Sequence, residues 1–236
     1  MSANHQSTAA PLLESVLEQL GSDIVAGALP EGKTFTLQDI SDRFDISRTV
    51  AREAMRALEQ LGLVSSSRRV GITVLPRSSW AVFDPAIIGW RLRTPEERRI
   101  QLHSLNELRI GVEPLAARSA ARNATPEQRA ELVELASRMQ ELGTGGHGAS
   151  EDFLDADVRF HALLLEISGN EMFAALAPSL LNVLRGRTTF GLQPQRPAPD
   201  ALEAHEALAH AIAEGNEEAA EEQSRRLLTE VRSSLR

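Results

Sequence analysis

The stretch that most constrains the fold is residues 47–61, SRTVAREAMRALEQL, whose pattern predicts an amphipathic helix. On a wheel with about 100° per residue, one arc carries three arginines, Arg48, Arg52 and Arg56. The opposite arc is apolar and holds Val50, Ala51, Ala54, Leu58 and Leu61. Ser47 is a suitable N-cap, and Gly62 is a suitable end. Such a helix buries one face against other elements and leaves its arginine face exposed.

The segments around this helix narrow the fold to one arrangement. Apolar spacing predicts a helix over 11–27 and a short helix over 36–44, with Thr36 as the N-cap of the second. Residues 63–75 predict two short strands around a basic tip. Three helices followed by a β-hairpin is the order of a winged helix-turn-helix.

Only helical patterns follow the breaker PRSS at 76–79. We predict a winged helix-turn-helix domain over 1–76, a linker with a short helix over 77–94, and an all-α antiparallel bundle over 95–236. The expected helices of the bundle cover 95–122, 126–142, 150–168, 171–188, 200–214 and 216–235. The predicted fold class is therefore mainly α.

The net charge of −8 would oppose DNA binding if it were spread evenly over the surface. Residues 46–69, however, hold five arginines and only two acids, so positive charge is concentrated on the arginine helix and the hairpin. The major groove admits a helix, and arginine suits both guanine edges and phosphates. Ser47 and Thr49 can donate to phosphates at the helix start, and Arg68 and Arg69 can reach a flanking groove.

Composition excludes several classes of protein. The chain has no cysteine, so disulfides and thiolate metal sites are excluded. The opening MSANHQSTAA has neither a positive start nor an apolar run, so we expect no signal peptide. No apolar stretch approaches about 18 residues, the length that would indicate a membrane span. We therefore expect a cytoplasmic protein with no membrane partner.

The predicted bundle carries polar side chains on faces that should be buried. Asp157 and His161 lie four residues apart in the middle of an apolar arc, and His205 also faces inward. Polar groups that point into a core must be satisfied. An Asp–His hydrogen bond beside a core histidine would satisfy them, and so would one metal ion bound by carboxylate and imidazole.

Arginines supply a second sign of a polar site in the bundle. Arg109 sits within the apolar arc of its predicted helix, where an unpaired charge would be costly. Glu113 can pair with it internally, and a small carboxylate effector can pair with it instead. Arg185 and Arg187 lie on a helix that Gly186 interrupts, so the wheel leaves their direction open.

SRTVAREAMRALEQLGLV followed by RRVGITV resembles the winged-helix domain of the GntR family of regulators. The second half resembles the FCD effector domain of the FadR-type branch of that family, so the resemblance spans about 12–235. It implies a sequence-specific transcriptional regulator that binds a palindromic DNA operator as a homodimer. It also implies DNA contacts by four residues: Ser47, Arg48, Thr49 and Arg52. Arg56 has geometric support alone.

The chain also departs from the family pattern at two positions of the DNA-binding domain. The helix before the arginine helix often carries an arginine where this chain has Gln38, and the first glycine of the usual wing is here Arg69. The common operator preference of the family therefore does not transfer directly to this chain.

The resemblance has consequences for the bundle as well. DVRFH matches the D-x-x-x-H motif of the FCD domain, and His205 in ALEAHEAL matches its next histidine. The resemblance thus implies a divalent metal ion (Zn²⁺, Mn²⁺ or Ni²⁺) on Asp157, His161 and His205, with water or the effector completing the coordination. A third histidine usually follows on the last helix, where this chain has Leu227. With one protein ligand fewer, weaker binding or none is expected.

DPAIIGWRL and the ELR–VEP pair resemble FCD regulators of sugar-acid catabolism, of the galactonate or gluconate type. The implied function is a repressor that is released by a small carboxylate effector, an aldonate or similar hydroxy acid. Four residues are expected to bind this effector: Arg109, Asn182, Arg185 and Arg187. A long acyl effector is the alternative within the same fold.

Other interpretations stay open from the residues alone. An arginine stripe also fits a solvated helix with salt bridges, although the neighbouring helices and hairpin favour DNA binding. A metal-dependent hydrolase could use Asp157, His161 and His205, but no general base stands at a spacing such as H-E-x-x-H, so we predict no enzyme. A DNA-free ligand-binding helical protein would ignore its own promoter region.

Overall fold

The computed structural model describes residues 6–234, which fold into two compact units. The first unit reaches Arg98 and the second starts at Arg99. Helices dominate both units, and the described residues contain one small β-sheet, so the predicted mainly α fold class is confirmed. Within the same residues, no helix combines the length and the apolar character needed to cross a lipid bilayer.

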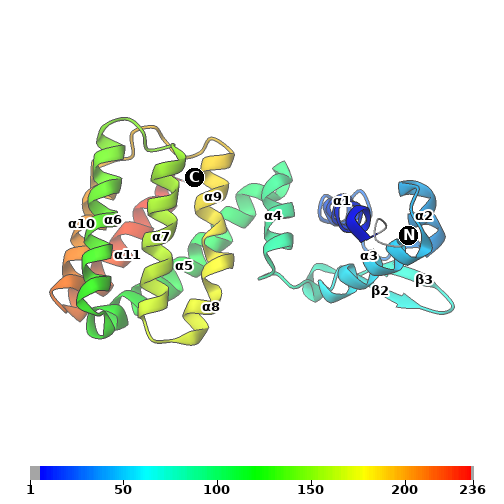
Figure 1. Ribbon diagram of the computed structural model, residues 1–236, viewed down its shortest axis with the longest axis horizontal. Coiled ribbons are helices and arrows are strands. Elements are labelled where there is room, and N and C mark those ends of the chain that lie inside the picture. Colours follow the sequence, from blue (N-terminus) through cyan, green and yellow to red (C-terminus); the bar gives the residue numbers. More distant parts are fainter. Residues whose placement is uncertain (1–5, 235–236) are drawn as a thin grey trace. The chain divides into compact units, whose positions relative to one another are not determined.

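The first unit begins with a winged helix-turn-helix, as predicted (Figure 1). Its elements are α1 (Gln6–Val25), β1 (Thr34–Phe35), α2 (Leu37–Phe44), α3 (Arg48–Gln60), β2 (Val64–Ser67) and β3 (Gly71–Val74). The strands form an antiparallel sheet in the order β1-β3-β2, with Ser67 opposite Gly71 at the end of the β2–β3 hairpin. This hairpin is the wing, and Arg68 and Arg69 lie in its turn.

Capping side chains set the starts of α2 and α3. The Ser47 hydroxyl accepts a hydrogen bond from the Val50 amide at 3.3 Å, and Thr36 forms a capping box with Asp39. The buried face of α3 packs against α1, α2 and β2, and it consists of Ala51, Ala54 and Leu58. Burial of this face fixes the rotation of α3, so the arginine face must point to solvent.

A short 3-10 helix, η1 (Arg77–Ser79), and helix α4 (Pro85–Arg93) follow the wing. Helix α4 packs against α1, where the Trp90 indole covers Gly21 and donates to Glu18 Oε2 at 2.9 Å. Trp90 therefore belongs to the same apolar core as the winged helix. The residues that follow the wing are thus packed into the first unit.

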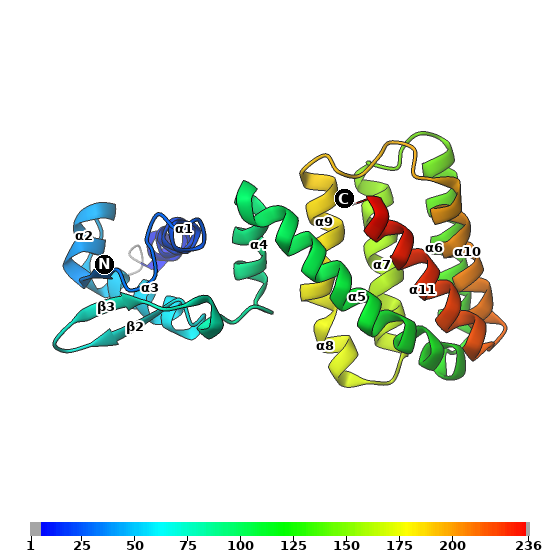
Figure 2. The ribbon, with the colours of Figure 1, turned by 180° about the vertical axis from the view of Figure 1, so that it is seen from behind.

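The second unit is an antiparallel helical bundle, seen from two sides in Figure 1 and Figure 2. Its helices are α5 (Pro95–Asn123, which begins in the first unit), α6 (Pro126–Thr144), α7 (Glu151–Ile167), α8 (Glu171–Leu180), α9 (Asn182–Thr189), α10 (Pro199–Ala213) and α11 (Glu217–Ser234). Helix α10 packs against α6 and α11, and α6 packs against α7.

The single helix predicted over 171–188 is wrong, because the structure has two helices there, α8 and α9, which meet at Leu181. Pro178 lies inside α8 and has no amide hydrogen, so the backbone hydrogen bonding of this stretch cannot be continuous. The Asn182 side chain donates to the Pro178 carbonyl at 2.8 Å. The apolar spacing continues across this break, which is why the pattern does not reveal it.

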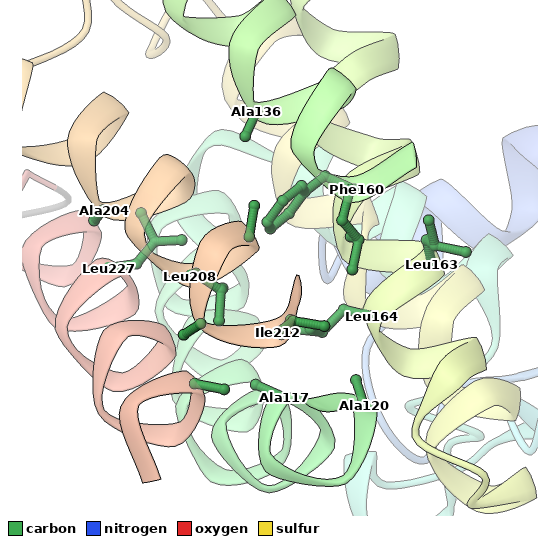
Figure 3. Close-up of a cluster of buried hydrophobic side chains, with 14 of the residues drawn as sticks. Ala117, Ala120, Ala136, Phe160, Leu163, Leu164, Ala204, Leu208, Ile212 and Leu227 are labelled. Atoms are coloured by element: carbon green, nitrogen blue, oxygen red, sulfur yellow. The ribbon is translucent and has the colours of Figure 1, made fainter. Parts of the chain in front are cut away.

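Small and large apolar side chains interlock in the core of the bundle (Figure 3). Alanines on α5, α6 and α10 let the helix backbones approach closely, and leucines with Phe160 and Ile212 fill the remaining space. Phe160 lies edge-on to His161 and to His205, with 5.4 Å between ring centroids in both cases. The apolar core therefore forms one wall of a cluster of polar side chains.

Candidate DNA-reading face and effector cavity

The residues predicted to contact DNA are all exposed, on α3 and the wing: Ser47, Arg48, Thr49, Arg52, Arg56, Arg68 and Arg69. An open groove between α2, α3 and the wing is lined by four of them, Arg48, Arg52, Arg56 and Arg68. Gln38, at the start of α2, lines the same groove. The fold therefore gathers positive charge from a helix and a hairpin along one groove, as contact with a DNA backbone requires.

The arginines of α3 differ in their partners. Arg48 donates to Gln38 Oε1 from Nη2 at 2.7 Å and from Nε at 3.2 Å, and Gln38 donates in turn to Asp42 at 2.7 Å. Arg56 pairs with Glu53 at 3.1 Å, and both side chains are exposed. Arg52 forms no ion pair within residues 6–234. Among the described residues, Arg52 is therefore the arginine of α3 that no other side chain holds in place.

The second unit encloses a cavity of about 240 Å³ beside its apolar core. Helices α5, α7, α9, α10 and α11 and the segment 190–198 contribute to its wall. Six polar side chains line the cavity: Arg109, Asp157, His161, Arg187, Gln193 and His205. The structure thus brings the three predicted metal ligands together with two of the predicted effector residues.

The other two predicted effector residues do not lie at the cavity. Arg185 is exposed, and the Asn182 amide is bonded to the backbone of the preceding helix. Positions two apart on a helix differ by about 200° in direction, so α9 turns Arg187 inward and Arg185 outward. We therefore leave Asn182 and Arg185 out of the candidate site.

Arg109 is neutralised within its own helix. Its side chain is 1% exposed, and its Nε and Nη2 donate to Glu113 Oε1 and Oε2 at 2.5 Å and 3.2 Å. Glu113 is fully buried, and its Oε2 also lies 2.8 Å from His161 Nδ1. Burial alone would raise the pKa of Glu113, but the charges of Arg109 and His161 outweigh burial and hold this pKa at about 2.

Asp157 lies between the two histidines. Its Oδ1 is 3.3 Å from His161 Nε2 and 3.5 Å from His205 Nε2. Burial would raise the pKa of Asp157, but the two imidazoles outweigh it and lower that pKa. Burial lowers the pKa of His161, but the Glu113 and Asp157 carboxylates together outweigh it and raise that pKa. Asp157 Oδ1, His161 Nδ1 and His205 Nε2 still lack a well-aligned hydrogen bond, although each has a polar neighbour.

Asp157, His161 and His205 fit a divalent metal ion. His205 Nδ1 lies 2.7 Å from the Ala201 carbonyl, which can only accept, so in the neutral ring Nδ1 carries the proton and Nε2 presents a lone pair. Glu113 places the proton of neutral His161 on Nδ1 in the same way. Ligand atoms of the three residues all lie within 4.8 Å of one another. In metal sites, the ligating nitrogens of histidines typically point to one position, while a carbonyl or a carboxylate on the other nitrogen holds each ring in place.

Arg187 is the second buried arginine of the cavity. It is 8% exposed, its Nε has no hydrogen-bond partner, and within the described part of the chain no carboxylate forms an ion pair with it. Burial lowers the pKa of Arg187, and the charge of Asp157 offsets this only in part. A buried guanidinium without a partner carries a free-energy cost that a bound anion would remove.

The segment 190–198 covers one side of the cavity, a role that the sequence did not predict. The amides of Leu192 and Gln193 donate to the Arg187 carbonyl at 2.7 Å and 3.1 Å. The other end of the segment is fixed where the Gly148 amide donates to the Gln195 carbonyl at 2.8 Å. The run LQPQRPAPD signals a loop through its prolines, but nothing in it says which surface the loop covers.

An arginine-lined winged helix followed by a helical unit with a buried polar cavity defines a class of protein, the DNA-binding transcriptional regulators. Comparison with protein families agrees: residues 12–74 match the bacterial regulatory proteins of the gntR family, and residues 104–230 match the FCD domain. This chain belongs to the GntR family and carries an FCD domain.

Individual relatives are similar over most of their length. The chain is 29% identical over 227 residues to the galactonate operon transcriptional repressor of Escherichia coli K12, which covers 94% of this chain and 95% of that one. It is 28% identical over 215 residues to the HTH-type transcriptional regulator LutR of Bacillus subtilis 168, covering 87% and 92%. These relatives are transcriptional regulators.

Two solved structures share the fold. Lar of Listeria monocytogenes is 18% identical with a TM-score of 0.58 and covers 94% of this chain and 95% of that one. McbR/YncC of E. coli is 19% identical with a TM-score of 0.51 and covers 95% and 96%. At these identities the likeness concerns the fold alone.

Proposed function

We propose that this protein is a transcriptional repressor that leaves its operator when a small hydroxy carboxylate binds in the cavity of the helical unit. The cavity itself carries the proposal. It holds about 240 Å³ and is lined by the unpaired Arg187 and by unsatisfied atoms of Asp157 and His205. Such a lining favours an anion with hydroxyl groups, because each buried polar atom would gain a partner.

The class of effector is supported by size and by one relative. Pockets for drug-sized ligands measure roughly 300–1,000 Å³, so this smaller cavity favours a sugar acid over a long acyl chain. The galactonate operon repressor is named for the operon of a sugar acid. We therefore propose an aldonate or a similar hydroxy acid as the effector.

On the DNA side, we propose that residues 1–76 bind the operator, 77–94 connect, and 95–236 bind effector and dimerise. Two copies of the winged helix would match a palindromic operator, with one α3 in the major groove of each half-site. Ser47, Thr49 and the arginines of α3 and the wing would supply the contacts. A bacterial operator lies in the cytoplasm, so the protein would act there.

We also propose that Asp157, His161 and His205 hold a divalent ion such as Zn²⁺, Mn²⁺ or Ni²⁺. When bound, the ion would supply positive charge that attracts an oxygen of the effector. The side chain of Leu227 lines the cavity and offers no fourth ligand, so water or the effector would complete the coordination. Measuring the metal content of the purified protein, and its change in His205→Ala, tests this point.

We infer that this group binds and does not catalyse. A hydrolase would need a general base near the ion. Glu113 is the carboxylate behind His161, but Arg109 holds its pKa at about 2, which makes it a poor base near neutral pH. Turnover of sugar lactones or esters by the pure protein would contradict this inference.

Release of the operator requires that the effector bind one spacing of the two winged helices better than the other. Helix α5 carries Arg109 and Glu113 beside the cavity and starts one residue after α4, which is packed on the winged helix. A change in the cavity therefore has a continuous backbone route to the DNA-binding unit. The sign of the effect, release rather than recruitment, is part of the proposal.

Two variants separate the two activities. Arg52→Ala should abolish binding to the protein's own promoter region, measured by gel shift at low salt, and leave effector binding intact. His161→Ala should keep operator binding and lose the response to effector. Arg99→Ala, which also removes an exposed arginine, is the control. Loss of both activities in both variants would show that the assignment of domains is wrong.

A further inference from the structure

Two arginines reach the cavity, and the structure gives them different electrostatic environments. Arg109 faces a carboxylate in its own helix through two hydrogen bonds, at 2.5 Å and 3.2 Å. That carboxylate, Glu113, is fully buried and has no solvent to compensate it if Arg109 turned away. Two of the five N–H groups of Arg109 are therefore committed to Glu113, and its charge is already compensated. Any movement of Arg109 toward a ligand would weaken this buried ion pair and leave Glu113 with His161, which is unfavourable.

Arg187, by contrast, has no carboxylate partner among the described residues. Arg187 is only 8% exposed, and its Nε has no hydrogen-bond partner. No carboxylate of residues 6–234 forms an ion pair with it. Its backbone carbonyl is held by the amides of Leu192 and Gln193, which fixes the start of the side chain at the edge of the cavity. A planar guanidinium held in this way can bind a carboxylate through two parallel hydrogen bonds.

We propose that Arg187 binds the carboxylate of the effector, whereas Arg109 is a positioning residue that acts through Glu113 on His161. This inference rests on the proposed function, since it assigns roles within the effector cavity. It gives different roles to two arginines that are both expected from the sequence to bind the effector. It also predicts the chemistry of the rest of the ligand.

The remaining unsatisfied atoms define what the other end of the ligand must offer. Asp157 Oδ1 accepts only, and His205 Nε2 accepts when its Nδ1 donates to Ala201. These two acceptors are 3.5 Å apart and need donors or a cation between them. The Gln193 amide, from the covering segment, can both donate and accept. The class of ligand is a monocarboxylate with its acid group at Arg187 and hydroxyls directed to Gln193 and to Asp157 and His205, either as donors to these two acceptors or through the divalent ion proposed to lie between them.

The test compares Arg187→Gln with a matched control on the same helix. Arg185→Gln makes the same change two residues away on an exposed side chain. A third protein, Arg109→Gln/Glu113→Gln, removes both charges of the buried pair at once, so that neither is left uncompensated. Calorimetry with the full chain would use galactonate, the neutral polyol galactitol, the shorter acids glycerate and lactate, and hexanoate, an acid without hydroxyl groups. The metal content of every protein is measured alongside.

Arg187→Gln should weaken galactonate binding by at least about tenfold, the loss expected for a charge-assisted double hydrogen bond. Its affinity for galactitol should not change, so the preference for the acid over the polyol disappears. Arg185→Gln should retain wild-type affinities within about threefold. The Arg109→Gln/Glu113→Gln protein should retain the preference for the acid, because any disturbance of His161 affects acid and polyol alike.

Two results would overturn the inference, and they differ from failure of the proposed function. If Arg187→Gln kept the preference for galactonate, or if the Arg109→Gln/Glu113→Gln protein lost it, then the two arginines would have the opposite roles. If the wild-type chain bound its operator but none of the acids, the proposed effector class would be wrong and the inference would fall with it. Binding of hexanoate as tightly as galactonate would refute the role of the hydroxyl groups.

Discussion

The guanidinium of Arg48, a proposed DNA contact, is already held by a neighbouring side chain. Two hydrogen bonds join it to Gln38 Oε1, and Gln38 is itself oriented by Asp42. A side chain that is oriented before binding loses less conformational entropy when it forms a bidentate contact with a base. Gln38 therefore orients the first arginine of α3 without adding a charge of its own.

Replacing this glutamine tests that role. We expect Gln38→Ala to lower operator affinity about two- to fivefold, the effect of losing the exposed hydrogen bonds that orient Arg48, and to relax sequence preference at one base pair per half-site. The measurement is a gel-shift series over operators with single base-pair changes. Gln60→Ala, which changes an exposed glutamine at the end of α3, is the control. An unchanged preference in Gln38→Ala would show that Arg48 needs no partner.

Glu113 makes the stability of the protein depend on acid pH. Its pKa is held at about 2 in the folded state, below the ordinary value of 4.5. A carboxyl group whose pKa is lowered by folding contributes stability above its unfolded pKa, and that stability is lost as pH falls toward the folded pKa. The expected loss between pH 5 and 2 is on the order of 3 kcal/mol.

Denaturant unfolding across this pH range measures the effect. The free energy of unfolding of the wild type should fall more steeply below pH 5 than that of Arg109→Gln/Glu113→Gln, in which the group that titrates is absent. Single Glu113→Gln should be the least stable of the three proteins near neutral pH, because it leaves Arg109 buried without its partner. Parallel slopes in the wild type and the double variant would contradict this account.

One contact of this site could be predicted from the sequence, and two other features could not. The spacing of Arg109 and Glu113 made an internal pair one of two options, and the pair is present. The contact between Glu113 and His161 joins two helices, α5 and α7, and no wheel drawn for one helix contains it. The direction of Arg187 depended on the break between α8 and α9, which the apolar pattern hides.

At the scale of elements, the wing depends on Gly71. This residue has φ +91°, and a Cβ atom there would lie 2.8 Å from the backbone oxygen of Phe35. Both the dihedral angle and the neighbouring strand therefore exclude a side chain. Because the neighbour is backbone of β1, it cannot move aside without breaking the pairing of β1 with β3.

We expect Gly71→Ala to destabilise the first unit by about 1–3 kcal/mol and to lower operator affinity, while effector binding is unchanged. Gly32→Ala is the matched control, since Gly32 has φ +77° but open space around it. Thermal unfolding and gel shift together separate the two variants. If both variants lost the same free energy of unfolding, the positive φ angle alone would account for the loss, and the contact with β1 would contribute nothing.

The elements themselves were largely predictable. Residues 47–61 have an apolar face and a polar face at helical spacing, which predicts a helix with Ser47 as its N-cap. In the structure this helix starts at Arg48, directly after Ser47. Strand β1 was missed because two residues are too few to show an alternation. It forms by pairing with β3, far along the chain, so the signal for it lies in the tertiary structure.

At the scale of the molecule, the proposed switch obliges the two ligands to affect each other equally. If a sugar acid lowers operator affinity by some factor, then the operator must lower affinity for that acid by the same factor. Typical coupling between two sites is about 5- to 150-fold. We expect calorimetric titration of galactonate into the protein–operator complex to show this reduction, at the salt concentration used for the gel shifts.

A scrambled DNA duplex of the same length is the control, because it should leave affinity for the acid nearly unchanged. Arg187→Gln should need at least about tenfold more galactonate to release the operator, in line with its weaker binding of the acid. An acid that binds equally well with and without operator would mean that the cavity is not linked to DNA binding. The regulatory signal would then have to enter elsewhere.

The indole of Trp90 lies where a side chain on α1 would otherwise be, with Gly21 beneath it. This contact decides how the DNA-binding half can be studied alone. A fragment cut after the wing would leave a hydrophobic socket on α1 open to water and would be prone to self-association. A fragment that ends at Arg98 includes Trp90, which keeps this apolar surface of α1 covered. A fragment that ends at Arg98 is therefore the suitable one for studying the winged helix-turn-helix without the helical bundle.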